Sequence, residues 1–362
     1  SEMCIRDRGH IIGGILLFGA GLIGGRLRQG SMNTTAFSFG PLGAKGFAFL
    51  NMLQLIGWTS IMIYDAMLAL QELAPLSPMI WTIAIGALVI LWLFIGLHNT
   101  GYIQAIVSIL LLGLTLYMGT HMISQWPSEG GLLTSGNMSF IAALELSIAM
   151  PLSWLPLISD YTRESKHPLT ASLTSATIYT VTSIVMYTLG LSAAIFGGGD
   201  SIITIMMNAG LGLAGLLVII FSTVTTTFMD AYSAGVSSTT IYNSASSKGI
   251  AVIVTIVGTI AAILYPMDDI TDFLYLIGSV FTPMIAILLA DYFMNRQQVQ
   301  TLSAFLVRGT IWAVSVGLYH YMLHTESTVG ATLPAFTMAF IITTIIGFVS
   351  KTVKVSTEVK QP

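Results

Sequence analysis

The stretch of sequence that decides the fold is AMPLSWLPLISDYTR, residues 149–163. It closes an apolar run that begins near Ser139, and it contains two prolines, Pro151 and Pro156, before a charged exit. Proline has no backbone N–H and clashes with the preceding turn, which costs about 3 kcal/mol inside a helix. Broken helices in membranes occur where the backbone is buried in protein or lines a wet cavity. The stretch therefore predicts a break at residues 150–156 that forms a binding site, with a proline-kinked structural helix as the alternative.

The composition indicates a membrane protein with many spans. Charged residues make up 8% of the 362 residues and hydrophobic residues 54%, whereas soluble domains contain about 25% charged residues. A membrane-spanning helix needs about 20 mostly apolar residues. By that rule the eleven candidate spans are residues 9–25, 46–70, 79–97, 102–123, 139–160, 170–196, 210–240, 249–265, 270–293, 304–323 and 332–350. The connections are short, so residues 1–362 form a single predicted transmembrane domain.

The distribution of Lys and Arg predicts the orientation, because these residues mark the cytoplasmic loops. All basic residues after the first span fall on one side of the predicted membrane, and the opposite loops contain none. They are Arg26, Arg28, Lys45, Arg163, Lys166, Lys248, Arg296, Arg308, Lys351, Lys354 and Lys360. The C-terminus is therefore predicted to be cytoplasmic.

The first residues break this pattern. Counting back through eleven spans puts Arg6 and Arg8 on the side that otherwise lacks basic residues. The chain begins with Ser1, and residues 1–8 are polar, whereas the segment that follows is apolar. We therefore expect that residues 1–8 are not native sequence and that the first of twelve helices is missing.

The second predicted span has a polar stripe. Its members recur at three- and four-residue steps and so share one helical face: Asn51, Gln54, Trp58, Met62 and Asp65. Such a stripe faces protein or water rather than lipid. Trp58, near the middle of the span, is a candidate for stacking on a flat ligand, with ordinary aromatic packing as the alternative. Met62 is more typical of core packing, and Asp65 of a solvated helix end.

Acidic residues flank the predicted break. A carboxylate at the bilayer centre costs about 2.5–3.5 kcal/mol, so a function is the first hypothesis for Glu145. We consider a gate there, with hydrogen-bonded packing or direct ligand contact as alternatives. Asp160 and Arg163 are expected to form a local ion pair at the inner end of the span. Asp291 and Arg296 form a similar charged exit.

The seventh predicted span has a second polar face, which consists of Ser222, Thr225, Thr226, Met229, Asp230 and Ser233. The neighbouring hydroxyls of Thr225 and Thr226 suit a hard monovalent cation, which binds several oxygens. Asp230 is the deepest acid, able to accept hydrogen bonds from an amino-heterocycle or to take up a proton. In the alternative interpretation, the hydroxyls bond back to their own helix, but this does not explain a stripe that ends in an acid.

Several motifs together resemble nucleobase:cation symporter family 1. They are Gly57-Trp58, the Asp-Tyr-Thr-Arg of residues 160–163, the triple threonine of residues 225–227, residues 230–235 (DAYSAG) and residues 290–293 (ADYF). Residues 151–163 are most similar to the hydroxymethylpyrimidine transporter branch, CytX. The resemblance implies a leucine-transporter-type fold, all-α with two inverted five-helix repeats. Residues 9–293 then contain helices two to ten, and residues 304–350 contain two peripheral helices.

The resemblance also implies a site. In the family the substrate ring lies between aromatic residues of helices three and six and amides of helix eight. The corresponding substrate-binding residues are Gln54, Trp58, Ser153, Trp154 and Asp230, and the cation-binding residues are Ser222, Thr225 and Thr226. Two departures from the family pattern matter. Trp154 is about one turn closer to residue 160 than the usual aromatic, and Thr227 and Asp230 replace asparagines, which favours a substrate with amino donors.

The expected function is secondary active import of a pyrimidine, hydroxymethylpyrimidine for thiamine salvage, coupled to Na⁺ or H⁺. Cytosine or another purine or pyrimidine is the alternative within the family. A channel needs a continuous polar pore, and an enzyme needs a nucleophile with its base or a metal cluster, which the lone Cys4 does not supply. We expect a monomer in the cell inner or plasma membrane, with no cofactor, no metal beyond Na⁺ at Thr225 and Thr226, and no nucleic acid partner.

Overall fold

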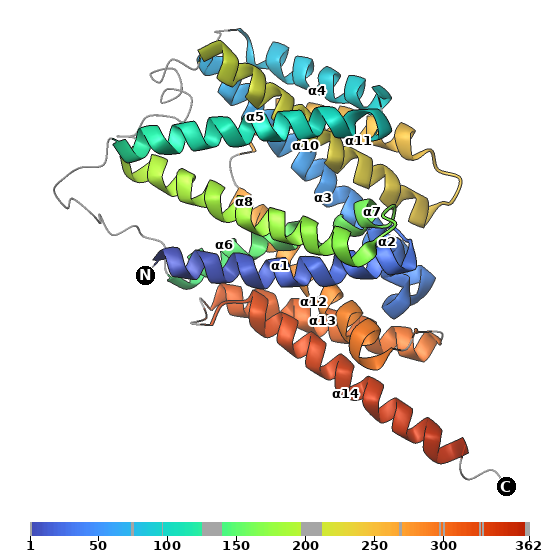
Figure 1. Cartoon of the computed structure of the whole chain (residues 1–362). Coiled ribbons are helices and arrows are strands. Elements are labelled where there is room, and N and C mark those ends of the chain that lie inside the picture. The colour runs from blue at the N-terminus through green and yellow to red at the C-terminus, as the bar shows by residue number, and fades with distance from the viewer. Residues whose placement is uncertain are drawn as a thin grey trace. The chain divides into compact units, whose positions relative to one another are not determined.

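The computed structural model describes residues 2–73, 76–95, 97–124, 140–196, 212–267, 270–296, 298–299, 301–325, 327 and 329–358. In these ranges every regular element is a helix (Figure 1). The helices are α1 (Glu2–Leu27), α2 (Ser31–Thr34), α3 (Ala36–Leu73), α4 (Pro78–Ile95), α5 (Leu97–Ser124), α6 (Phe140–Ser153), α7 (Ile158–Thr162), α8 (Pro168–Phe196), α10 (Gly212–Ile241), α11 (Ser247–Leu264), α12 (Ile270–Leu289), the π-helix η1 (Ala290–Asn295), α13 (Leu302–His324) and α14 (Thr332–Glu358). The predicted all-α fold class is confirmed.

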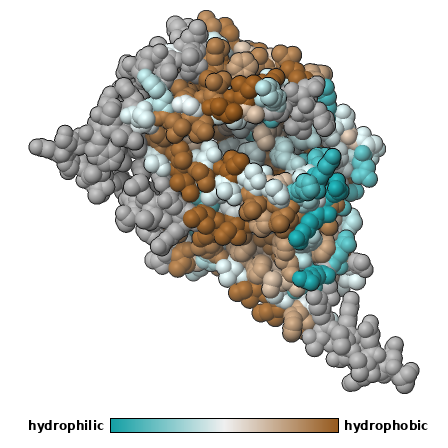
Figure 2. Space-filling model, viewed as in Figure 1, coloured by the Kyte–Doolittle hydropathy of each residue, from teal (hydrophilic) through white to brown (hydrophobic). Residues whose placement is uncertain are grey.

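Nine helices in the described ranges are long and apolar enough to cross a membrane, and they coincide with nine of the eleven predicted spans. The predicted span 102–123 lies in α5, whose described apolar segment, Tyr102–Tyr117, is shorter than a full crossing. The predicted span 139–160 is divided between α6 and α7. Figure 2 shows large areas of hydrophobic surface, as expected for helices that face lipid.

The chain divides into two compact units. The first contains Ser1–Asn51, Met138–Val181 and Thr271–Pro362, and the second contains Met52–Asn137 and Thr182–Ile270. Helices α3 and α8 contribute to both units, because the boundaries fall inside them. The expectation of one transmembrane domain stays a prediction.

In the first unit, small residues of α1 let it pack closely on α6 and α7. A Cβ atom added at Gly13 would lie 2.7 Å from the Cβ atom of Pro151, and one added at Gly24 would overlap the side chain of Ser159. Helices in membranes approach this closely where small residues line the interface. The packing role predicted for this glycine-rich span is confirmed.

A buried ion pair joins the C-terminal helices of the first unit. Nη2 of Arg308 in α13 donates to Oδ1 of Asp291 in η1 at 2.9 Å. Nδ2 of Asn295 donates to the same carboxylate and to the carbonyl of Thr343 in α14, each at 3.0 Å. From the sequence we pair Asp291 with Arg296 and count Arg308 among the basic residues of a loop. Both interpretations are wrong, because Asp291 binds Arg308. Arg308 lies inside α13 and is 6% exposed, and hydropathy does not reveal such a long-range pair.

In the second unit, helices α4, α10 and α11 enclose a buried apolar cluster of Val89, Trp92, Leu93, Val224, Phe228, Ala231 and Ala251. Gly235 of α10 lies against the carbonyl of Ser247 at the start of α11, where a Cβ atom has no room. A second cluster joins α3, α4 and α11 through Ile63, Ala66, Met67, Leu70, Ile85 and Ala262. These contacts hold α10 in place and so position the polar face that the helix contains.

We predict that Arg308→Met destabilises the protein by about 3–5 kcal/mol, because it leaves the carboxylate of Asp291 buried without its cation. Thermal unfolding in detergent measures this as a lower midpoint. The double variant with Asp291→Leu is expected to recover most of the loss, because it removes both buried charges. Lys45→Met is the control, since Lys45 is exposed, and it should leave the midpoint unchanged. A single Arg308 variant as stable as the wild type contradicts the assignment.

Candidate functional site

The predicted break is present, but it lies a few residues later than expected. Helix α6 ends at Ser153 and α7 begins at Ile158, with turns at residues 154–157. Pro151 lies inside the last turn of α6, so it does not end the helix. Pro156 accounts for the position, because it has no N–H to continue the helix and disfavours helical backbone at the residue before it. The end of α6 narrows to a 3₁₀-type turn, in which the N–H of Trp154 donates to the carbonyl of Pro151, three residues earlier, at 3.2 Å.

Side chains bind the carbonyl groups that the break leaves open. The carbonyl of Met150 accepts hydrogen bonds from the hydroxyls of Ser153 (2.7 Å) and of Tyr179 in α8 (3.1 Å). The carbonyl of Pro156 accepts one from Nδ2 of Asn51 in α3 (3.3 Å). Buried backbone groups without partners are costly, so these bonds permit an irregular backbone here. The alternative of a merely kinked helix is wrong, because the helix is interrupted.

Tyr179 was not predicted as a site residue. Its ring centroid lies 5.8 Å from that of Trp154, with the planes tilted by 52°. Asn51 belongs to the predicted polar stripe, but only the fold shows that its amide binds the broken segment. The sequence gives no signal for Tyr179, because α8 is largely exposed and its polar residues follow no single face. Both predicted site residues of the first unit, Ser153 and Trp154, lie at the break, Ser153 buried and Trp154 half-buried.

The other substrate residues lie in the second unit. Gln54 is buried, and Trp58 one turn later is half-buried. Asp65 is exposed, as expected for a solvated acid, but it lies eight residues before Leu73, where α3 ends, and so not at the helix end. Asp230 in α10 is 6% exposed, and no hydrogen bond or ion pair from another described residue reaches its carboxylate. The convergence of these residues with Ser153 and Trp154 on one pocket stays a prediction.

The predicted cation-binding residues lie together on α10. The hydroxyls of Thr225 and Thr226 donate to the same carbonyl, that of Ser222, at 3.0 and 2.9 Å. This is the back-bonding that the sequence allows as an alternative. It uses the hydroxyl protons, and the oxygen lone pairs remain able to accept or to coordinate. The two oxygens would therefore fit a cation as ligands without giving up these bonds.

Glu145 caps a helix. Its Oε1 accepts hydrogen bonds from the backbone N–H groups of Ala331 (2.9 Å) and Thr332 (3.1 Å), and its Oε2 accepts from the Thr332 N–H and hydroxyl. These groups form the start of α14, where the first N–H groups lack partners within the helix. The hydrogen-bonded packing role is thus observed, whereas the gate stays a prediction.

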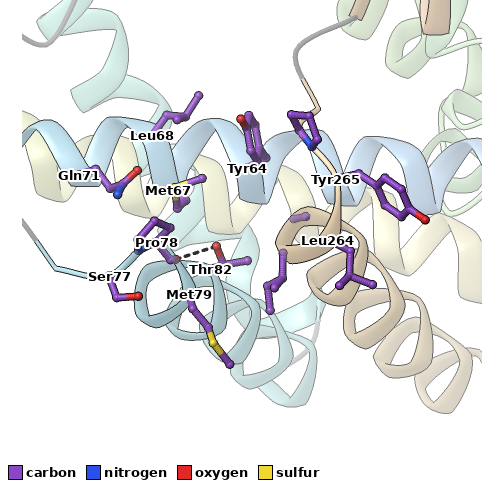
Figure 3. Close-up of a pocket in the computed structure, with 13 residues that line it drawn as sticks. Tyr64, Met67, Leu68, Gln71, Ser77, Pro78, Met79, Thr82, Leu264 and Tyr265 are labelled. Carbon is purple, nitrogen blue, oxygen red and sulfur yellow. Dashed lines mark hydrogen bonds between the residues drawn. The ribbon is translucent and has the colours of Figure 1, made fainter.

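A cavity of about 440 Å³ lies in the second unit at the ends of α3, α4 and α11 (Figure 3). It is lined by Tyr64, Met67, Leu68, Gln71, Ser77, Pro78, Met79, Thr82 and residues 262–266. The hydroxyl of Thr82 donates to the carbonyl of Pro78 at 2.9 Å. None of the predicted substrate or cation residues belongs to this lining, so the cavity is separate from the predicted site. In the described part of the chain, no three His, Cys, Asp or Glu side chains are placed to hold a metal.

Comparison with solved structures shows the fold of a membrane transporter. The chain aligns with a nucleobase-cation-symport-1 family transporter, Mhp1, in a closed conformation with bromovinylhydantoin bound, at a TM-score of 0.78 and 17% identity over 96% of this chain and 84% of that one. The inward-facing conformation of Mhp1 gives a TM-score of 0.77, at 17% identity over 97% and 84% of the two chains. A Na⁺-coupled sialic acid symporter gives 0.66 at 14% identity over 96% and 85%. The predicted leucine-transporter-type architecture is confirmed.

In sequence, the chain is similar to cytosine permease of Escherichia coli strain K12, with 22% identity over 317 residues, 86% of this chain and 75% of the permease. Cytosine permeases of two further E. coli strains match equally well. No family model matches the chain. All these relatives are transporters, in agreement with the expectation that the chain is not an enzyme.

We predict that Tyr179→Phe weakens ligand binding at the break, because the Met150 carbonyl loses one of its two hydroxyl donors while the ring contact with Trp154 is kept. Loss of one such hydrogen bond costs about 1 kcal/mol. Thermal unfolding of the variant reports the stability, and titration with candidate pyrimidines reports the affinity. Tyr242→Phe is the matched control, because Tyr242 is exposed at the end of the second unit's α10. Equal behaviour of both variants contradicts a role for Tyr179.

Proposed function

We propose that the chain is a member of nucleobase:cation symporter family 1 that imports a pyrimidine, with hydroxymethylpyrimidine as the substrate. The observation that supports this most directly is Asp230, an acid buried in a membrane span with no hydrogen-bond or ion-pair partner among the described residues. A buried carboxylate without a partner is costly. A ligand that donates hydrogen bonds, or a proton, removes that cost.

An aminopyrimidine has the chemistry that these residues would recognise. Its amino group donates to the carboxylate of Asp230, its flat ring stacks on Trp58 or Trp154, and its ring nitrogens accept from the amide of Gln54. None of these residues is basic, which suits an uncharged ring. Residues 151–163 resemble the hydroxymethylpyrimidine branch, which is the reason to name that substrate for thiamine salvage.

Cytosine is the second candidate, because cytosine permease is the curated relative that matches the chain over 317 residues. Cytosine also has an exocyclic amino group, so the same contact with Asp230 serves both substrates. Both are six-membered rings, but hydroxymethylpyrimidine carries a hydroxymethyl and a methyl group, whereas cytosine has no hydroxymethyl group and has a carbonyl at the position of the methyl. Competition between them for uptake therefore separates the candidates.

We further propose coupling to Na⁺ or H⁺. Thr225 and Thr226 would supply hydroxyl oxygens to Na⁺, and Asp230 is the group that would take up H⁺. The Na⁺-coupled sialic acid symporter shares the fold, which supports the first choice. We also propose a monomer in the inner or plasma membrane, with a cytoplasmic C-terminus that the basic loops support. Arg308 is buried and is therefore left out of the count of basic loop residues. The other basic residues after the first span still fall on one side of the predicted membrane.

The direct test is uptake of radiolabelled hydroxymethylpyrimidine and cytosine by the full chain, expressed in a host without its own pyrimidine uptake. Saturable accumulation that collapses with the Na⁺ or H⁺ gradient supports the symporter. Passive equilibration indicates a channel, and chemical conversion of the label indicates an enzyme, so either result contradicts the proposal.

We predict that Asp230→Asn and Trp58→Ala abolish substrate binding without lowering expression. The first removes the negative charge and replaces one of the two acceptor oxygens by an NH₂ donor that opposes the substrate's amino group, and the second removes the stacking surface. Binding is measured by titration with the purified protein. Trp58→Phe keeps an aromatic face and should retain part of the affinity, and Asp65→Asn, an exposed acid on the same helix as Trp58, should retain all of it. Wild-type affinity in the first two variants refutes the assigned site.

A further inference from the structure

Each half of the broken helix presents a buried carboxylate to the start of a different helix. In α6 this residue is Glu145, 4% exposed, and in α7 it is Asp160, 2% exposed. Both lie in the first unit, as do the helices that they bind. Buried carboxylates require partners, and here the partners are the first N–H groups of helices far away in the sequence.

The first anchor, at Glu145, joins α6 to α14. Glu145 accepts from two consecutive backbone N–H groups and from the hydroxyl of Thr332. Gly330 has φ +75°, and a Cβ atom at that position would overlap the carboxylate. Only glycine therefore allows this approach. Bonds to an ionised acceptor at a helix N-terminus are stronger than those between neutral groups.

The second anchor, at Asp160, joins α7 to α1 and α2. The N–H of Ser31 donates to Oδ1 of Asp160 at 2.8 Å, and the N–H of Ser159 donates to the hydroxyl oxygen of Ser31 at 3.0 Å. The two helix starts thus cap each other. The hydroxyls of Ser159 and Thr162 also donate to the carbonyls of Ala20 and Gly21 in α1, at 2.9 and 2.8 Å. These bonds compensate for the shortness of α7, which has five residues.

The turn between the anchors is held mainly by local bonds. The N–H groups of Leu155 and Leu157 donate to the carbonyls of Leu152 and Trp154, at 3.1 and 3.0 Å. A long-range bond also reaches this turn, from Nδ2 of Asn51 to the carbonyl of Pro156, at 3.3 Å. The carboxylates of the two halves therefore bind different helices, α14 and α2, while α1 packs on both halves. The segment that joins the halves contains Trp154.

We propose that Glu145 and Asp160 are positioning residues that anchor the two halves independently and so set the geometry of the binding turn. Neither side chain needs to touch the substrate. Glu145 fixes Ser153 from one side of the turn, through α14, and Asp160 fixes the other side through α1 and α2. The effect on a pyrimidine ligand rests on the proposed function, whereas the anchoring itself does not.

Hydrogen exchange of the full chain in lipid nanodiscs, without ligand, tests the anchoring. Glu145→Gln keeps one acceptor oxygen but removes the charge and the second acceptor, so it should lower the protection of the amides of Ala331 and Thr332 and leave that of Ser31 unchanged. Asp160→Asn should do the reverse. The matched controls are Glu72→Gln and Asp272→Asn, both at exposed positions, and they should alter neither site. Joint deprotection of both sites by either variant, or no deprotection by either, overturns independent anchoring.

Two milder variants keep the test decisive where a carboxylate variant does not fold. Thr332→Val and Ser31→Ala each remove a hydroxyl that takes part in one anchor and retain every backbone N–H. Each should deprotect its own anchor only, and Thr332→Ser should restore protection, because it keeps the hydroxyl. A Thr332→Ser variant as deprotected as Thr332→Val overturns the role of the hydroxyl bond to Glu145.

Ligand titration then tests the positioning. Variants at either anchor should bind the pyrimidine of the wild type about tenfold more weakly or worse, since bonds to charged groups are lost. Unchanged affinity together with lost protection overturns the positioning role. A wild type that binds no pyrimidine counts against the proposed function alone, because the exchange result decides the anchoring without a ligand.

Discussion

The structure depends on one constraint, that a helix interrupted within the membrane must find partners for its open backbone groups. Lipid offers none. Here the hydroxyls of Ser153 and Tyr179 and the amide of Asn51 bind the carbonyls at the break. The same constraint explains the glycine-rich α1, because close packing is what brings its carbonyls within reach of Ser159 and Thr162. The irregular segment is therefore a product of its neighbours as much as of its own prolines.

Local features of the sequence predict much of this fold. Hydropathy alone locates nine crossing helices, although α3 begins ten residues before its predicted span, because the apolar run needed to cross a bilayer is a property of the segment itself. The break is predicted from its prolines at residues 150–156, and the turns lie at residues 154–157, so the break begins four residues later than expected. Pro151 lies inside the final turn of α6, which continues to Ser153, while Pro156 lies in the turns where the helical path ends.

Long-range pairs are what the sequence does not reveal. Asp291 has a nearby arginine at position 296, but its carboxylate binds Arg308, which lies on another helix. Glu145 stands alone in its span and yet binds the start of a helix 187 residues later. In both cases the partner is selected by how helices pack, and helical periodicity gives only the face of a residue. For the same reason Thr225, Thr226 and Asp230 are predictable as one face of α10, but their partners are not.

The π-helix at residues 290–295 has a consequence for descent. A π turn contains one residue more than an α turn. Because the wide turn already accommodates the extra residue, deleting one residue within it would restore a regular α-helix without turning the residues on either side. An asparagine three residues after the acid, rather than four, would still lie on the face toward α14. Relatives that lack the extra residue are therefore expected to keep the acid and the asparagine at this shorter spacing.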